Sequence, residues 1–150
     1  MIPLIVLALA LVMARLVGIW GVASLDSWPA ATRVGLAVMF CFTAVAHFNA
    51  MRRDLANMVP SWVPNPALVV LVTGICEVTG AIGLLIPQTR PVAAIALVLF
   101  LIAVFPANVH AAKAGVTLRG KPATPLLPRT LMQLLFIALT LWAGFIAANR

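Results

Sequence analysis

The feature that most constrains the fold is an almost wholly apolar run, residues 68–86, with the sequence LVVLVTGICEVTGAIGLLI and one carboxylate, Glu77, near its middle. The hydrocarbon core of a bilayer is about 30 Å thick, and roughly 20 apolar residues cross it as a helix. A charge at that depth costs about 2.5–3.5 kcal/mol or more unless it is paired, protonated or turned toward a cavity. The run therefore predicts a transmembrane helix, and the surroundings of Glu77 become the first question about function.

Composition places the whole chain in the membrane class. Hydrophobic residues make up 64% of the sequence, charged residues 9%, and the mean hydropathy is +1.15. A soluble domain has about 45–50% apolar residues. The excess lies in long runs, which predicts a single polytopic domain, residues 1–150, surrounded by the lipid bilayer. The net charge of +7 does not indicate nucleic-acid binding, because the basic residues mostly lie in short loops between apolar runs.

The apolar runs predict five spans, and none alternates with the period of two that a β-barrel needs. We expect helices at residues 2–25, 31–50, 67–86, 91–112 and 129–148. The first run lacks a preceding basic segment and exceeds the usual signal-peptide core of about 7–15 residues, so we expect a retained helix. Apolar residues at helical spacing before Pro60 predict a short helix at the membrane interface.

The charges of the loops predict the orientation. Cytoplasmic loops carry an excess of Lys and Arg. With five spans, six basic residues fall on one side and three on the other. The larger group comprises Arg52, Arg53, Lys113, Arg119, Lys121 and Arg129, and the smaller comprises Arg33, Arg90 and Arg150. The N-terminus and the two basic loops are therefore expected on the inner side.

Alternating topology brings polar side chains toward one membrane face. The second and fourth spans run in the same direction, so His47 near the end of one and Asn108 and His110 near the end of the other lie toward that face. The third span starts there and carries Glu77 to mid-depth. We therefore predict a polar cluster of His47, Glu77 and Asn108. Arg15, in the first span, either pairs with Glu77 or extends along its aliphatic stem to the membrane surface.

Four motifs follow one another from residue 42 onward. They are FTAVAHF, MVPSWVPNPALVVLVTGICEVTGAIGLLIP, FPANVHAAK and a final span that contains Gln133. In this order they resemble the DoxX-like family of small bacterial membrane proteins. The resemblance covers about the last two-thirds of the chain. It implies a four-helix bundle in the bacterial inner (plasma) membrane, to which the first run adds a helix.

The same resemblance also points to site residues and a chemistry. It implies that the polar residues of the bundle are His47, Glu77, Asn108, His110 and Gln133. The family takes its name from a subunit associated with a quinol oxidase, and relatives are linked to thiosulfate:quinone oxidoreduction. A shared fold implies a reaction far less strongly than it implies an architecture.

Three interpretations of the polar cluster stay open. Interhelical hydrogen bonds, each on the order of 1 kcal/mol, could simply fix the bundle. A quinone or another small lipophile could bind there, with Glu77 or His47 donating a hydrogen bond or carrying a proton. Haem or a metal ion held by His47 and His110 has less support, because two histidines near one face are a weak pattern.

The favoured hypothesis is an all-α, polytopic transmembrane helix bundle that acts as an accessory subunit in quinone-linked membrane redox chemistry. No nucleophile with a base, phosphate loop or nucleotide fingerprint is present in the sequence, so we do not expect an independent enzyme. A redox partner protein would then carry the cofactor. The alternatives are a structural or interaction protein and a small-molecule transport component, which would need a homo-oligomer because 150 residues enclose little pathway alone.

Overall fold

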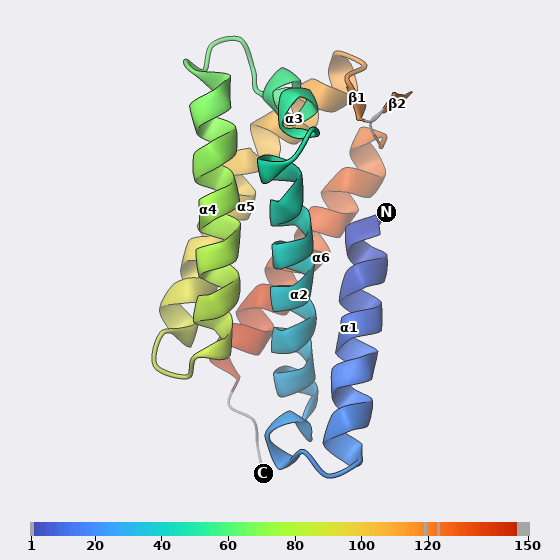
Figure 1. Cartoon of the computed structure of the whole chain (residues 1–150), viewed down its shortest axis with the longest axis vertical. Helices are drawn as coiled ribbons and strands as arrows, with labels where there is room; N and C mark the ends of the chain where they lie inside the picture. The colour runs from blue at the N-terminus through green and yellow to red at the C-terminus, as the bar shows by residue number, and fades with distance from the viewer. Residues whose placement is uncertain (1, 119, 123, 147–150) are drawn as a thin grey trace.

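Long apolar helices make up most of the computed structural model, which describes residues 2–118, 120–122 and 124–146 (Figure 1). They are α1 (Ile2–Ile19), α2 (Trp28–Phe48), α4 (Pro66–Leu85), α5 (Arg90–Lys113) and α6 (Leu126–Phe145). In the part of the chain that is described, these five helices are long and apolar enough to cross a membrane. The protein is therefore an all-α, multi-pass membrane protein, and the predicted fold class is confirmed.

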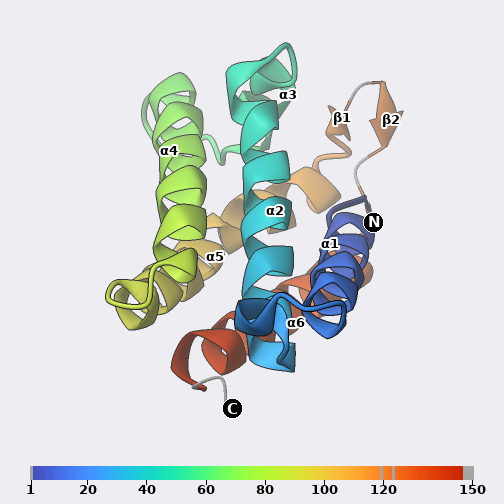
Figure 2. The same cartoon turned by 60° about the horizontal axis from the view of Figure 1, so that its bottom comes forward.

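Short elements connect the spans. A 3₁₀ turn (Ala23–Leu25) lies between α1 and α2, and α3 (Arg52–Met58) forms the short helix expected before Pro60. A two-stranded antiparallel hairpin, β1 (Thr117–Leu118) and β2 (Lys121–Pro122), lies between α5 and α6. We call the end of the bundle with α3 and this hairpin the hairpin end. The opposite end, with the turns at residues 20–27 and 86–89, is the turn end (Figures 1 and 2).

Most helix bounds lie within three residues of those expected from the sequence. The largest difference is in the first span, where α1 ends at Ile19 rather than at residue 25 because the backbone of Gly21 turns with a φ of +122°. The last helix begins at Leu126, directly after Pro125. Its expected end at residues 147–148, and the basic residues Arg119 and Arg150 of the orientation argument, lie outside the described residues.

Proline and a capping side chain mark the start of two spans. Ser27 accepts a hydrogen bond from the backbone N–H of Ala30 at 3.3 Å, and Asn65 accepts one from Leu68 at 3.3 Å. In each case a proline occupies one of the first two helical positions, where its missing N–H removes no bond from the helix. These local signals explain why α2 and α4 begin where they do.

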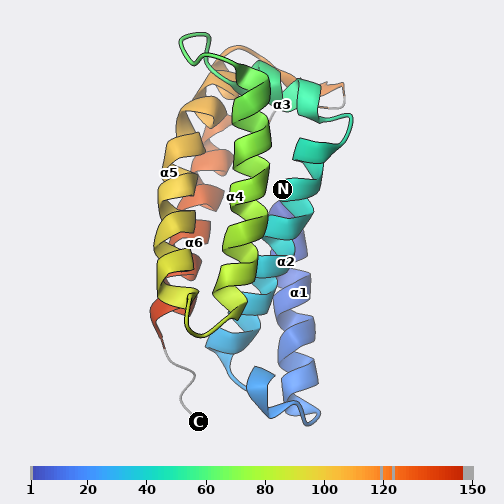
Figure 3. The ribbon, with the colours of Figure 1, turned by 60° about the vertical axis from the view of Figure 1, so that its left-hand side comes forward.

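The arrangement of the helices is a four-helix core with one helix added outside. The central helix, α2, packs against α1, α4 and α6, while α4 also packs against α5, and α5 against α6 (Figures 1 and 3). Glycines allow close helix approach, as is usual in membranes. A Cβ at Gly80 would collide with Leu97 of α5, and one at Gly144 would collide with Ala94. The outer helix α1 packs chiefly on α2.

Candidate functional site

A polar pair lies buried between α2 and α4. Thr43 Oγ1 of α2 donates a hydrogen bond to Glu77 Oε1 at 3.0 Å, and His47 Nε2 lies 3.4 Å from Glu77 Oε2. Thr43 and His47 are one helical turn apart, so both point at the same position on α4. Glu77 itself is only 7% exposed. The predicted meeting of His47 with Glu77 is therefore present in the structure.

The contacts of the second nitrogen of His47, Nδ1, determine which ring nitrogen carries the hydrogen. Nδ1 lies 2.7 Å from the backbone oxygen of Val70 and 3.1 Å from Thr73 Oγ1. A carbonyl oxygen can only accept, so Nδ1 must carry the hydrogen. In a neutral imidazole the other nitrogen, Nε2, then has a free lone pair facing Glu77 Oε2. A hydrogen bond between Nε2 and Oε2 therefore requires one additional proton, held by either atom.

Glu77 Oε2 is a buried oxygen with unused hydrogen-bonding capacity. Within the described residues it has no hydrogen-bond donor. Its 3.4 Å separation from His47 Nε2 exceeds the usual 2.7–3.2 Å range of an N–H···O bond. A buried polar atom left without a partner costs roughly 1–3 kcal/mol. The arrangement can therefore accept a hydrogen bond from, or donate a shared proton to, a third group.

A glycine lets the two helices approach closely at this point. A Cβ at Gly74 would lie 2.6 Å from His47 Cβ and 3.0 Å from the ring of Phe48. Any larger residue would push the imidazole away from α4. Gly74 therefore positions His47, and it stands one residue after Thr73, the other side chain that contacts Nδ1.

A second polar network joins α5 to α6. Asn108 donates to Gln133 Oε1 at 3.2 Å, Arg129 Nη1 donates to Asn108 Oδ1 at 2.8 Å, and Gln133 Nε2 donates to the Leu101 carbonyl at 2.8 Å. Asn108 and Gln133 were both predicted to be polar residues of the bundle interior, and the structure brings these two together.

The prediction of a single cluster is corrected by these contacts. No hydrogen bond or ion pair joins Asn108 to His47 or Glu77 in the part of the chain that the structure describes. Topology sets the depth of a side chain along its helix, but packing sets which neighbour the side chain faces. Asn108 shares the hairpin half of the bundle with His47 and turns toward α6 instead.

Two further candidates also lie elsewhere. Arg15 forms an ion pair with Asp26 at 2.5 Å, and its guanidinium lies 5.5 Å from the ring centre of Trp28, so the predicted alternative of pairing with Glu77 is corrected. The turn after α1 brings Asp26 back to Arg15, so the guanidinium has a carboxylate partner at the turn end. His110 is half-buried on α5, and no hydrogen bond links it to His47 among the described residues.

Two arginines that were expected to be loop charges belong to the polar interior. Arg33 is 5% exposed and donates from Nη1 to the backbone oxygens of Ala143 at 3.1 Å and Ile146 at 3.4 Å. Arg129 is the cation of the α5/α6 network. A signal existed for Arg33, since it stands one turn after Pro29 at the start of a helix and so falls inside the apolar run.

Comparison with protein families adds one finding to this geometry. Residues 36–147 match the family described as a domain of unknown function, DUF8561. The chain belongs to the DUF8561 family. The matched range holds both polar networks of this DUF8561 chain, whereas α1 lies before it. No curated protein and no solved structure matches the chain.

Proposed function

We propose that this DUF8561 chain is an accessory subunit of a membrane redox system and that Glu77 and His47 bind the head group of a quinone. The observation that carries the proposal is Glu77 Oε2, a buried carboxyl oxygen that has no donor among the described residues and lies beside an imidazole lone pair. Intramembrane ionisable residues are costly and usually serve a function. The resemblance to DoxX-like proteins supports the same chemistry and extends the proposal to the bacterial inner membrane.

The Glu77–His47 pair can both donate and accept a hydrogen bond, and the two oxidation states of a quinone need one of each. A quinone carbonyl accepts a hydrogen bond, and a protonated Glu77 carboxyl or His47 imidazolium can donate it. A quinol hydroxyl donates a hydrogen bond, and the free lone pairs of Oε2 can accept it. In this proposal the chain supplies position and a proton, while a partner protein supplies the electrons.

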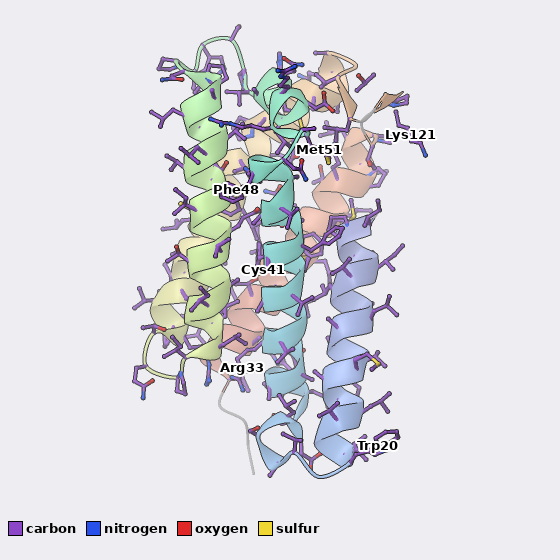
Figure 4. The ribbon with its side chains drawn as sticks, viewed as in Figure 1. Trp20, Arg33, Cys41, Phe48, Met51 and Lys121 are labelled. Atoms are coloured by element: carbon purple, nitrogen blue, oxygen red, sulfur yellow. The ribbon has the colours of Figure 1, made fainter. Side chains whose placement is uncertain are left out.

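The lipid surface supplies the route to the pair. Phe48 follows His47 in the chain, is 55% exposed and covers Gly74 with its ring. Figure 4 shows it in the hairpin half of α2. In this proposal a lipophilic molecule enters between α2 and α4 from the bilayer and displaces the Phe48 ring from Gly74.

The test compares the wild-type chain with Glu77→Gln, which keeps the side-chain shape and removes the acidic proton. Decylubiquinone is titrated into the purified chain in detergent, and quinones co-purified from membranes are extracted and counted by mass spectrometry. We expect Glu77→Gln to weaken binding about tenfold, because the amide carries no acidic proton and its N–H can bond to the His47 Nε2 lone pair instead of the quinone, a difference of roughly 1.5 kcal/mol. The matched control is Asp26→Asn, which replaces a carboxylate that lies at the membrane surface.

Two results would reject the redox role. Equal decylubiquinone binding by wild-type and Glu77→Gln chains would show that the pair does not hold the head group. A Glu77→Gln chain that no longer folds, together with a wild-type chain that binds no quinone, would favour the structural alternative, in which the pair only joins α2 to α4.

A further inference from the structure

A pocket of about 280 Å³ opens at the turn end, and its lining does not include Glu77 or His47. Its walls come from the turn before α2, the first turns of α2 and α5, and the last turn of α4, all of which face the viewer in Figure 2. Arg33 and Arg90 line it together with Ser24 and with apolar side chains that include Leu25 and Leu85. Its volume is just below the range of roughly 300–1,000 Å³ usual for small-molecule sites.

The two guanidinium groups retain most of their donors. Arg33 uses only Nη1, which serves the C-terminal carbonyls of α6. Arg90 uses only Nε, which donates to the Leu84 carbonyl at 3.3 Å. A guanidinium has five N–H donors in a planar fork that matches a phosphate. The remaining donors of both arginines have no protein acceptor among the residues described, and they line one pocket.

The positive charge of this pocket is not balanced by the described part of the chain. The sequence has three acidic residues. Asp26 is paired with Arg15, Glu77 belongs to the pair between α2 and α4, and Asp54 lies on α3 at the opposite end. Two like charges on one pocket repel each other, so an anion between them would stabilise the fold.

The depth of the pocket is that of lipid head groups. Trp20 and Trp28 lie at the same end and are 85% and 57% exposed, as is typical of the aromatic belt at a membrane surface. Figure 4 shows Trp20 and Arg33 toward this end of the bundle. Leu85 and Ile86 beside the pocket expose 47% and 43% of their surface, which offers an apolar path for acyl chains.

We propose that Arg33 and Arg90 bind the phosphate group of an anionic phospholipid. Basic pockets between transmembrane helices on the cytoplasmic side hold such head groups in other proteins, and a pair of guanidinium forks suits a phosphate at either membrane face. The bound phosphate would tie α2 to α5 directly, and through the backbone contacts of the two arginines it would also hold the ends of α6 and α4. This site is independent of the proposed quinone function, because neither Glu77 nor His47 lines the pocket.

The test measures the thermal unfolding midpoint of the full chain in neutral detergent. Phosphatidylglycerol is added at increasing mole fraction, with phosphatidylcholine and inorganic phosphate as separate arms at constant ionic strength. We expect phosphatidylglycerol to raise the midpoint more than phosphatidylcholine. In Arg90→Gln the mole fraction giving half of this effect should rise about tenfold or more, as for loss of a charge-assisted contact. The matched control is Arg52→Gln, which removes an arginine that makes one backbone hydrogen bond at the hairpin end.

A second variant keeps the test decisive if Arg90→Gln folds poorly. Ser24→Glu places a carboxylate in the pocket, so it should leave the lipid-free midpoint unchanged or higher and abolish the phosphatidylglycerol effect. Protection by inorganic phosphate that is lost in both variants would support the same site with free phosphate as its ligand. Equal effects of the two lipids, or the same phosphatidylglycerol effect in wild type, Arg90→Gln and Ser24→Glu, would overturn the proposal.

Discussion

At the scale of single residues, Glu77 owes its place in the membrane interior to its neighbours. Thr43 donates to one carboxyl oxygen, and His47 faces the other. The imidazole is held by Val70 and Thr73 on the same helix as the carboxyl group. His47 can reach that position only because Gly74 has no side chain. The site thus depends on a glycine that itself carries no chemistry.

The change Gly74→Ala tests this dependence. The added methyl group would lie 2.6 Å from His47 Cβ, so either the helices separate or the imidazole turns away. We expect a loss of about 1–3 kcal/mol in the free energy of unfolding, as for other overpacked positions. Chemical denaturation in mixed micelles measures this loss, and the histidine ¹⁵N shifts report the ring.

The neighbouring change Ile75→Ala is the control for that experiment. Ile75 is 52% exposed on the lipid-facing side of α4, and substitutions at such positions usually change stability by no more than about 0.5 kcal/mol. Equal stabilities and histidine shifts in Gly74→Ala and wild type would mean that the close approach at Gly74 is not required.

At the scale of elements, each polar network joins one pair of helices. Thr43, His47 and Glu77 join α2 to α4, whereas Asn108 and Gln133 join α5 to α6. Arg33 crosses from the start of α2 to the end of α6. Lipid removes the usual hydrophobic drive for helix association, so such contacts and small-residue packing decide which helices are neighbours.

Gln133→Leu should therefore loosen α5 from α6. The change removes the bond to the Leu101 carbonyl and the acceptor of Asn108, at an expected cost of about 0.6–1.7 kcal/mol of unfolding free energy. Asn108→Leu and the double variant Asn108→Leu/Gln133→Leu complete a double-mutant cycle. The unfolding free energy of each variant is measured by steric trapping or by denaturant. The double variant should lose less than the sum of the single losses, because the two side chains share a bond.

Thr130→Val is the control on the same helix, since the side chain of Thr130 donates, among the residues described, only to the Leu126 carbonyl of α6 itself. Strictly additive losses in the Asn108 and Gln133 cycle would contradict a direct link between the two helices.

At the scale of the whole molecule, the loop charges separate by end. The hairpin end holds Arg52, Arg53, Lys113, Lys121 and Arg129, and the turn end holds Arg33, Arg90 and the Arg15 that pairs with Asp26. The positive-inside rule then predicts that the hairpin end faces the cytoplasm and that the turn end, with its basic pocket, faces outward.

Cysteine labelling in whole cells tests this orientation. In a background with Cys41→Ala and Cys76→Ala, we expect Gln88→Cys at the turn end to react with a membrane-impermeant maleimide in intact cells. Ser61→Cys at the hairpin end should react only after the membrane is permeabilised. Both positions are exposed in the structure, so a reversed labelling pattern would reverse the predicted orientation.

Local sequence predicted the five long helices because apolar length is a property of each run by itself. It also predicted that His47 would lie with Glu77. The two side chains lie at a similar depth in the membrane, on α2 and α4, which are consecutive spans of the chain. It placed Asn108 wrongly with them, since the rotation of α5 depends on how Leu97 and Ala94 fit against Gly80 and Gly144. Such packing leaves no periodic trace in a single sequence.

The unequal lengths of the spans give the molecule an uneven fit to its bilayer. At 1.5 Å per residue, the 20 residues of α4 extend about 30 Å and the 24 residues of α5 about 36 Å. A hydrocarbon core of about 30 Å matches the first and is thinner than the second. Helix α5 should therefore tilt or carry its last turn, with Lys113, into the head groups. The protein should consequently perturb the surrounding lipids most on the flank formed by α5.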